Sequence, residues 1–204
     1  MSIALIVVDV QRDFCPGGAL AVPRGDEIIP ILNIYLRRAQ QRGVCVYASR
    51  DWHPQRSTHF QTDGGPWPVH CVQHTDGAAF HPALELPRDT VVVSKGMGPT
   101  DDGYSAFEAQ TDAGLLLEDA LRAAGIDCLC IGGLATDYCV RATVLDACSK
   151  RFRTILLLDA SRGVNVAPGD AERAITEMVR AGAYATTLER IGEIQPGLAA
   201  GGVT

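Results

Sequence analysis

Residues 3–8 read IALIVV, and Asp9 follows them directly. An unbroken apolar run of this length is typical of a strand buried on both faces of a parallel sheet. The next segment outward, residues 27–42, has apolar residues at the spacing of one helical face, and Gly43 stands where a helix commonly ends. A second apolar run follows at 44–48, so the chain starts with the order strand, helix, strand.

The same alternation continues to the end of the chain. Further strands are expected at 90–94, 128–131, 154–158 and 184–188, and further helices at 112–124, 136–150 and 170–181. This order predicts an α/β fold: a three-layer α/β/α, Rossmann-like sandwich around a mostly parallel, six-stranded sheet. We expect a single domain over residues 1–192 and a frayed, Gly- and Ala-rich tail over 193–204.

Composition narrows the classes of protein that remain. The chain has 204 residues, a net charge of −6 and a pI near 5.3, which argues against a nucleic-acid partner. Its apolar runs are too short to span a bilayer, and no secretory signal opens the sequence. Seven cysteines without a CxxC motif favour a reduced, cytoplasmic chain, with Cys45 and Cys148 expected in the core.

Three chemically capable residues follow strands of the expected sheet. Asp9 follows the first strand and Lys95 the third, while Cys139 lies a few residues beyond the fourth. Ligands of parallel sheets bind at the carboxyl ends of the strands, so these side chains are expected in one crevice. Lys95 is one of two lysines against sixteen arginines, which suggests a place for a compact ammonium group.

Cys139 lies in the stretch GGLATDYCV, residues 132–140, where a helix is expected to start. Free amides and the helix dipole there favour a thiolate, lower the expected pKa of the thiol and can hold an oxyanion. A carboxylate, an ammonium group and a thiol form a complete set for covalent amide hydrolysis. The alternatives are a capping Asp9, a chance Lys95 and a buried structural Cys139.

The irregular segment 50–87 carries a second set of candidate residues. Four potential ligands of a divalent metal ion lie within twenty residues: Asp51, His53, His59 and His70. Both tryptophans of the chain lie in the same segment, which is consistent with a pocket wall. The alternative is a polar loop whose histidines bind nothing. Cys71 fits a ligand role less well than its neighbour, and His74 and His81 are expected at the surface or in caps.

Seven motifs occur in one order: VDVQRDF (8–14), RDWHP (50–54), HF (59–60), WPVHC (67–71), SKG (94–96), YSAF (104–107) and GLATDYCV (133–140). Together they resemble the nicotinamidase–pyrazinamidase family of isochorismatase-like cysteine hydrolases. The resemblance runs from about residue 3 to residue 189 and implies the isochorismatase-like fold.

The resemblance also implies roles for individual residues. They comprise the catalytic triad Asp9, Lys95 and Cys139; the metal ligands Asp51, His53 and His70, with His59 ligating directly or through water; an oxyanion hole at the backbone amides of Ala135 and Cys139; a cis peptide between Leu134 and Ala135; and ring-binding aromatics Phe14, Trp67 and Tyr104.

The implied activity is metal-dependent hydrolysis of nicotinamide to nicotinate and ammonia through a thioester, as in NAD salvage, with pyrazinamide as a further substrate. One divalent ion per chain is implied, zinc first, with iron or manganese open. The implied protein is a cytoplasmic monomer or homo-oligomer without nucleic-acid or membrane partners. Two alternatives remain: a related cysteine amidase for another small amide, and a non-catalytic protein with a structural metal.

Overall fold

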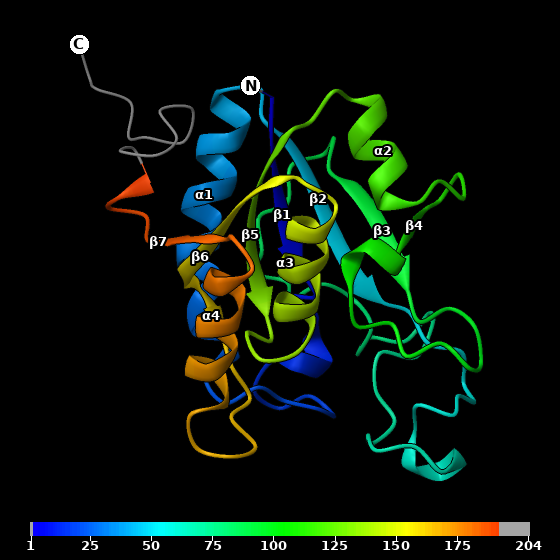
Figure 1. Ribbon diagram of the computed structural model, residues 1–204. Coiled ribbons are helices and arrows are strands. Elements are labelled where there is room, and N and C mark those ends of the chain that lie inside the picture. Colours follow the sequence, from blue (N-terminus) through cyan, green and yellow to red (C-terminus); the bar gives the residue numbers. More distant parts are fainter. Residues whose placement is uncertain (1, 192–204) are drawn as a thin grey trace.

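The computed structural model describes residues 2–191, so the predicted tail at 193–204 lies outside the described residues. Its central sheet has the strand order β4-β3-β2-β1-β5-β6-β7 (Figure 1). The strands are β1 (Ile3–Val8), β2 (Cys45–Asp51), β3 (Val91–Lys95), β4 (Gln110–Thr111), β5 (Cys128–Leu134), β6 (Arg153–Arg162) and β7 (Tyr184–Thr186). All neighbours pair in parallel except β3 and β4.

The prediction of a mostly parallel α/β fold is confirmed, but the count of six strands is wrong because the sheet has seven within residues 2–191. The additional strand, β4, has two residues and pairs antiparallel with Val93 and Ser94 of β3. A strand this short has no apolar run or alternation of its own. Its pairing with β3 forms it, and that is a tertiary contact.

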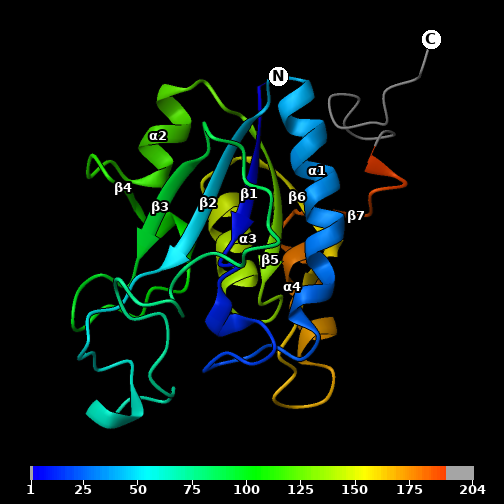
Figure 2. The ribbon, with the colours of Figure 1, turned by 180° about the vertical axis from the view of Figure 1, so that it is seen from behind.

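Helices cover both faces of the sheet, as the three-layer prediction requires. The helices are α1 (Ile29–Gln41), α2 (Leu117–Ala123), α3 (Cys139–Ser149) and α4 (Asp170–Arg180). Helix α1 packs on one face, which Figure 2 shows from the front, and α2, α3 and α4 pack on the other. Along β1, Leu5 and Val7 face α1 whereas Ala4, Ile6 and Val8 face the other layer, which explains the unbroken apolar run.

Several expected boundaries move. Helix α3 starts at Cys139 and not at 136, because Tyr138 has a non-helical backbone with φ −125° and ψ −102°. The turn before it is bonded to β6, where Thr136 N–H donates to Arg162 O at 2.9 Å. Helix α2 starts at Leu117 and not at 112. The core assignment of Cys45 is wrong, since this first residue of β2 is exposed, and Cys148 is only half-buried.

The carboxyl ends of β1, β2, β3 and β5 meet at one edge of the sheet. Val8 pairs with both Ser49 and Gly133, and Asp51 pairs with Lys95. The loops after these strands lie at the end toward which the arrows point in Figure 1. Residues far apart in the chain are thereby brought to one place. Within residues 2–191, no helix has the length and apolar character needed to cross a membrane.

Candidate active site

Asp9, Lys95 and Cys139 meet at this edge and are all buried. The Lys95 Nζ atom lies 2.7 Å from Asp9 Oδ2 and 3.6 Å from Cys139 Sγ. Ligand atoms of Asp9 and Cys139 also lie within 4.8 Å of each other. The prediction that these three side chains come together at one edge of the sheet is therefore confirmed, and of the three only Cys139 lines the cavity described below.

Local backbone structure directs Asp9 into the site. Asp9 has a left-handed φ of 51°, so the chain turns away from the sheet directly after β1. The Asp9 N–H still donates to Ser49 O at 3.1 Å, and the Ser49 hydroxyl donates to Asp9 Oδ1 at 2.7 Å. The second carboxylate oxygen, Oδ2, is left facing Lys95. The carboxylate is therefore held from one side while its other oxygen stays available for a proton.

Lys95 lies between two carboxylates. Its ammonium group donates to Asp51 Oδ1 and to the Gly103 carbonyl in addition to its ion pair with Asp9. Burial opposes a charge on this amine, but the carboxylates of Asp51 and Asp9 outweigh burial and raise the Lys95 pKa well above its usual value. Lys95 thus stays a cation and provides positive charge beside the thiol.

The pKa of Cys139 differs from the sequence expectation. Burial raises the pKa of this thiol well above its ordinary value, even though Lys95 acts in the opposite direction. The expected lowering of this pKa is therefore wrong in direction, because burial, reinforced by the Asp9 and Asp51 carboxylates, outweighs the ammonium of Lys95. Burial likewise raises the pKa of the Asp9 carboxyl, against the effect of Lys95. A protonated thiol thus lies beside a carboxylate that can accept its proton.

The turn before α3 brings Ala135 and Cys139 together. The Leu134–Ala135 peptide bond is cis, as the resemblance implied. The Val140 N–H donates to Ala135 O at 3.0 Å, and both Ala135 and Cys139 line the same cavity. The Thr143 hydroxyl donates to the Cys139 carbonyl at 2.7 Å and accepts from Ala106 N. The first turn of α3 is thereby anchored to the segment after β3.

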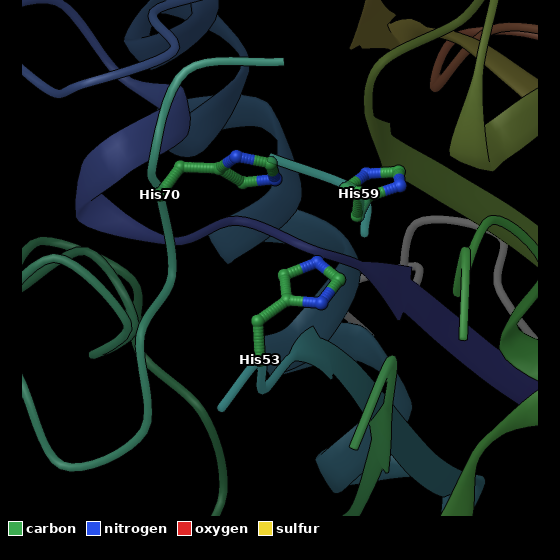
Figure 3. Close-up of side chains that lie close together, drawn as sticks. All are labelled: His53, His59 and His70. Carbon is green, nitrogen blue, oxygen red and sulfur yellow. The ribbon is translucent and has the colours of Figure 1, made fainter. Parts of the chain in front are cut away.

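Three histidines form a buried cluster next to the triad. His53, His59 and His70 each turn a ligand nitrogen to within 4.8 Å of the others, and their rings surround a common space in Figure 3. Neither ring nitrogen of His53 has a hydrogen-bond partner among the described residues. Buried polar atoms rarely lack partners, so this orphaned imidazole fits a metal ligand. His70 Nδ1–H donates to Pro68 O at 2.8 Å, which leaves its Nε2 for an ion.

Asp51 connects the histidine cluster to the triad. Its Oδ1 accepts from Lys95, and its Oδ2 lies 3.7 Å from the Nε2 atoms of both His53 and His70. Two ligands of one zinc ion, each at about 2.0–2.2 Å, can lie at most about 4.3 Å apart, so this spacing fits. Burial acts to raise the Asp51 pKa, but Lys95 and the histidines hold it well below its ordinary value. The side chain therefore remains a carboxylate, and the residues present fit a divalent ion.

His59 completes the cluster and has a partner that sequence analysis missed. Its Nδ1 lies 3.4 Å from Asp102 Oδ1. Burial, reinforced by His53, lowers the pKa of His59, so its ring is neutral and able to ligate. Asp102 lies in an irregular segment after β3. The signal available in the sequence was the pair of acidic residues at 101–102, six and seven positions beyond Lys95.

A cavity of about 460 Å³, counted with its open mouth, lies above these groups. Cys139, Asp51, His59 and His70 line it, and apolar and aromatic side chains make up most of the remaining wall: Phe14, Leu20, Val22, Trp67, Tyr104, Leu134, Ala135, Tyr138 and Val164. Trp67 Nε1–H donates to the Tyr104 hydroxyl at 2.9 Å. The predicted aromatics Phe14, Trp67 and Tyr104 thus all line the cavity, which suits a small planar ring.

Three further residues, to which sequence analysis assigned no role, contact the site or residues next to it in the structure. Tyr138 contacts the cavity and stacks edge-on to Trp67, with ring centroids 5.1 Å apart. Asp13 Oδ2 accepts from Cys71 N, the residue after His70, at 2.7 Å. Gln11 bonds the backbone of Asp51 through both ends of its amide. All three lie inside the motifs quoted above, and only their spatial neighbours reveal these contacts.

The family model described as the isochorismatase domain matches residues 3–190 of this chain. The chain belongs to this family. The isochorismatase-domain protein is also similar, over most of its length, to proteins named nicotinamidase or pyrazinamidase. It is 43% identical to the nicotinamidase of Escherichia coli over 94% of this chain and 98% of that one. It is 40% identical to the nicotinamidase/pyrazinamidase of Mycobacterium tuberculosis over 79% and 87% of the two chains.

A solved structure agrees with the placement in this family. The pyrazinamidase of Pyrococcus horikoshii, crystallised in complex with zinc, is 48% identical and superposes with a TM-score of 0.85, covering 92% of this isochorismatase-domain chain and 99% of that one. The predicted isochorismatase-like fold and the predicted family are therefore confirmed. The chain belongs with the nicotinamidases and pyrazinamidases of the isochorismatase-domain family.

Proposed function

We propose that this isochorismatase-domain protein is a nicotinamidase, a cysteine amidohydrolase that converts nicotinamide to nicotinate and ammonia and also deamidates pyrazinamide. One observation carries the proposal: a buried Asp9–Lys95–Cys139 cluster adjoins a histidine cluster beneath a cavity lined by aromatic rings. The names of its relatives support the choice of substrate. The reaction serves salvage of the pyridine ring for NAD.

In the proposed first half-reaction, Asp9 accepts the thiol proton while the Cys139 sulfur attacks the carboxamide carbon. Proton transfer coupled to attack avoids an isolated buried thiolate, whose formation the raised thiol pKa opposes. The Lys95 ammonium stabilises the developing negative charge on sulfur, and the backbone amides of Ala135 and Cys139 hold the oxyanion. The C–N bond then breaks, and ammonia leaves with the proton that Asp9 returns.

The second half-reaction hydrolyses the thioester. Asp9, again ionised, accepts a proton from water as the water oxygen attacks the thioester carbon. Collapse of the second tetrahedral intermediate breaks the C–S bond, Asp9 returns its proton to the Cys139 sulfur, and the released carboxylic acid loses its own proton to solvent to give the carboxylate. The apolar wall formed by Phe14, Trp67 and Tyr104 holds the ring over the sulfur in both halves.

Asp51, His53 and His70 would hold one divalent metal ion, with His59 as a further ligand, directly or through water. Zinc suits mixed carboxylate and imidazole ligands, and the Pyrococcus relative was crystallised with zinc. When bound, the ion supplies a Lewis acid that can hold a ring nitrogen of the substrate and orient the carboxamide. Each of these four side chains is already buried and turned toward the others.

Zinc removal and return provide a test that does not depend on turnover. Protein stripped by a chelator should rebind one zinc per chain, and zinc at 100 times its Kd should raise the free energy of unfolding by about 2.7 kcal/mol. His53→Ala should abolish both effects, because it removes a ligand whose two ring nitrogens have no hydrogen-bond partner within residues 2–191. His74→Ala, at an exposed histidine outside the cluster, is the control. Wild-type protein that binds no zinc, iron or manganese would contradict the metal assignment.

The hydroxyl of Tyr104 offers a second, smaller prediction. Tyr104→Phe removes the acceptor of the Trp67 indole N–H, whose bond is 2.9 Å long, and loosens the aromatic wall. One such hydrogen bond contributes about 0.5–1.5 kcal/mol, so KM for nicotinamide should rise about two- to tenfold while kcat changes little. Tyr184→Phe, at an exposed tyrosine on β7, should leave both constants unchanged. A fall in kcat with an unchanged KM would contradict a purely binding role.

An ammonia-release assay over a substrate panel tests the proposed function itself. Nicotinamide and pyrazinamide should give the highest kcat/KM, above maleamate and N-carbamoyl amides. The second candidate, a related cysteine amidase for another small amide, would be favoured by the reverse order. We further propose that residues 1–192 form one catalytic domain and that the protein is cytoplasmic, which seven cysteines without a CxxC motif support.

A further inference from the structure

Gln11 is a fully buried amide that no step of the proposed mechanism uses. Its Nε2 donates to Asp51 O at 2.8 Å and to Ala78 O at 2.9 Å, and its Oε1 accepts from Asp51 N at 2.8 Å. Two of the three bonds therefore hold the backbone of a single residue, and that residue is a proposed metal ligand and a partner of Lys95.

The need for these bonds follows from where β1 ends. The last β1–β2 pair is Val8 with Ser49, after which only the Asp9 N–H bonds to Ser49 O and the chain turns away. Alternate residues of a strand present their backbone groups to the same neighbour, so Asp51 turns its N–H and C=O toward the side that β1 has left. The Gln11 amide lies on that side and supplies the acceptor and the donor that a longer β1 would have supplied.

The backbone around Gln11 is anchored independently of Asp51. Three backbone hydrogen bonds join the segment 10–13 to the segment 77–81: Arg12 N to Ala79 O at 2.9 Å, Asp13 N to Gly77 O at 3.0 Å and His81 N to Val10 O at 2.9 Å. Gln11 itself forms an isolated antiparallel bridge with Phe80. The side chain thus extends from a fixed base and restrains the free end of β2.

We propose that Gln11 is the positioning residue that holds Asp51 so that its carboxylate faces the histidine cluster and Lys95 together. This inference rests on the proposed function, because it requires Asp51 to bind the metal ion. Loss of the amide leaves the Asp51 N–H and C=O buried without partners, and they can recover hydrogen bonds only if the strand end moves. Partners that orient metal ligands commonly change metal affinity by about 10- to 100-fold.

The test compares Gln11→Met with Asn33→Leu. Asn33, on α1 and not among the residues that line the cavity, makes a similar buried clamp: its Nδ2 donates to Ala83 O at 2.8 Å and its Oδ1 accepts from Glu85 N at 2.9 Å. Each substitution replaces the amide with an apolar side chain of similar length and so removes the hydrogen bonds of the amide. Two quantities are measured for each protein: the zinc dissociation constant, by competition with a chromogenic chelator, and the urea midpoint of the zinc-free form.

Both variants should lose stability, but only Gln11→Met should weaken zinc binding, by about 10- to 100-fold, while Asn33→Leu stays within about twofold of wild type. Equal zinc affinity in the two variants overturns the positioning role. If Gln11→Met does not fold, Gln11→Glu takes its place, since it keeps the acceptor for Asp51 N. A loss of zinc affinity of about threefold or more in Gln11→Glu supports the positioning role, and an unchanged zinc affinity overturns it.

The same measurements separate this inference from the proposed function. A wild-type protein that binds no zinc overturns both the metal site and the role of Gln11. A wild-type protein that binds zinc and hydrolyses nicotinamide, paired with a Gln11→Met variant of unchanged affinity, overturns the role of Gln11 alone.

Discussion

Replacing Cys139 with alanine should lower kcat/KM for nicotinamide by at least about 10⁴-fold, the scale of loss seen when a covalent nucleophile is removed. The variant keeps Asp9, Lys95 and the histidine cluster, so it should still bind zinc and still fold. The remaining groups can polarise an amide but cannot form the thioester. Ammonia release measures the loss, and zinc content shows that the site is intact.

Cys148→Ala is the matched control for this experiment, because it removes a half-buried thiol from the same helix, α3. Neither Asp9 nor Lys95 contacts Cys148, whose pKa is raised chiefly by burial. This variant should keep wild-type turnover. More than about 1% residual activity in Cys139→Ala, under conditions where Cys148→Ala is normal, would contradict the nucleophile assignment.

Replacing Lys95 with methionine should cost about 3–5 kcal/mol of unfolding free energy in the metal-free protein at pH 7, and it should also abolish turnover. Lys95 is fully buried between the carboxylates of Asp9 and Asp51, and its removal leaves two buried negative charges without compensation. A methionine of similar length fills the space but offers no charge and no donor. Urea unfolding of the zinc-free protein gives the stability change.

The control uses the chain's other lysine, Lys150, which pairs with Glu118 at 2.7 Å where about a third of each side chain is exposed. Solvent screens that pair, so Lys150→Met should cost less than about 1 kcal/mol and leave activity intact. Similar losses in the two variants would contradict the buried-charge account. Lys95→Arg should not restore activity, because the wide guanidinium fork does not match a site built around one ammonium group.

The sequence alone was sufficient for the order of the elements other than β4 and for the choice of most candidate site residues. Local patterns in the sequence indicate which segments are buried and where the chain turns. Examples are the apolar run of β1, the helix after it and the strand-end positions of Asp9 and Lys95. The histidine-rich segment was also visible, because four ligand types within twenty residues are unusual in any loop. The order of the seven motifs then indicated the family, and the match to the isochorismatase-domain model confirmed it.

Other features depend on contacts between distant parts of the chain. Strand β4 exists only because β3 pairs with it, and Cys45 is exposed although its residue type favours the core. The Cys139 pKa moves opposite to the sequence expectation, because desolvation is set by everything packed around the sulfur and not by the helix start alone. Sequence position records none of these surroundings.

The sequence of this protein thus determined which residues are candidates for the proposed chemistry. The tertiary structure decided their protonation, the distances between them and the hydrogen bonds that hold them in place. Asp9, Lys95 and Cys139 could be selected from strand ends and residue type. That Asp51 bridges Lys95 to the histidines, and that Gln11 takes the place of a strand that has ended, could not. The reason is physical: residue type fixes what a group can do, but only packing fixes the distances and the solvent exclusion that decide whether it does so.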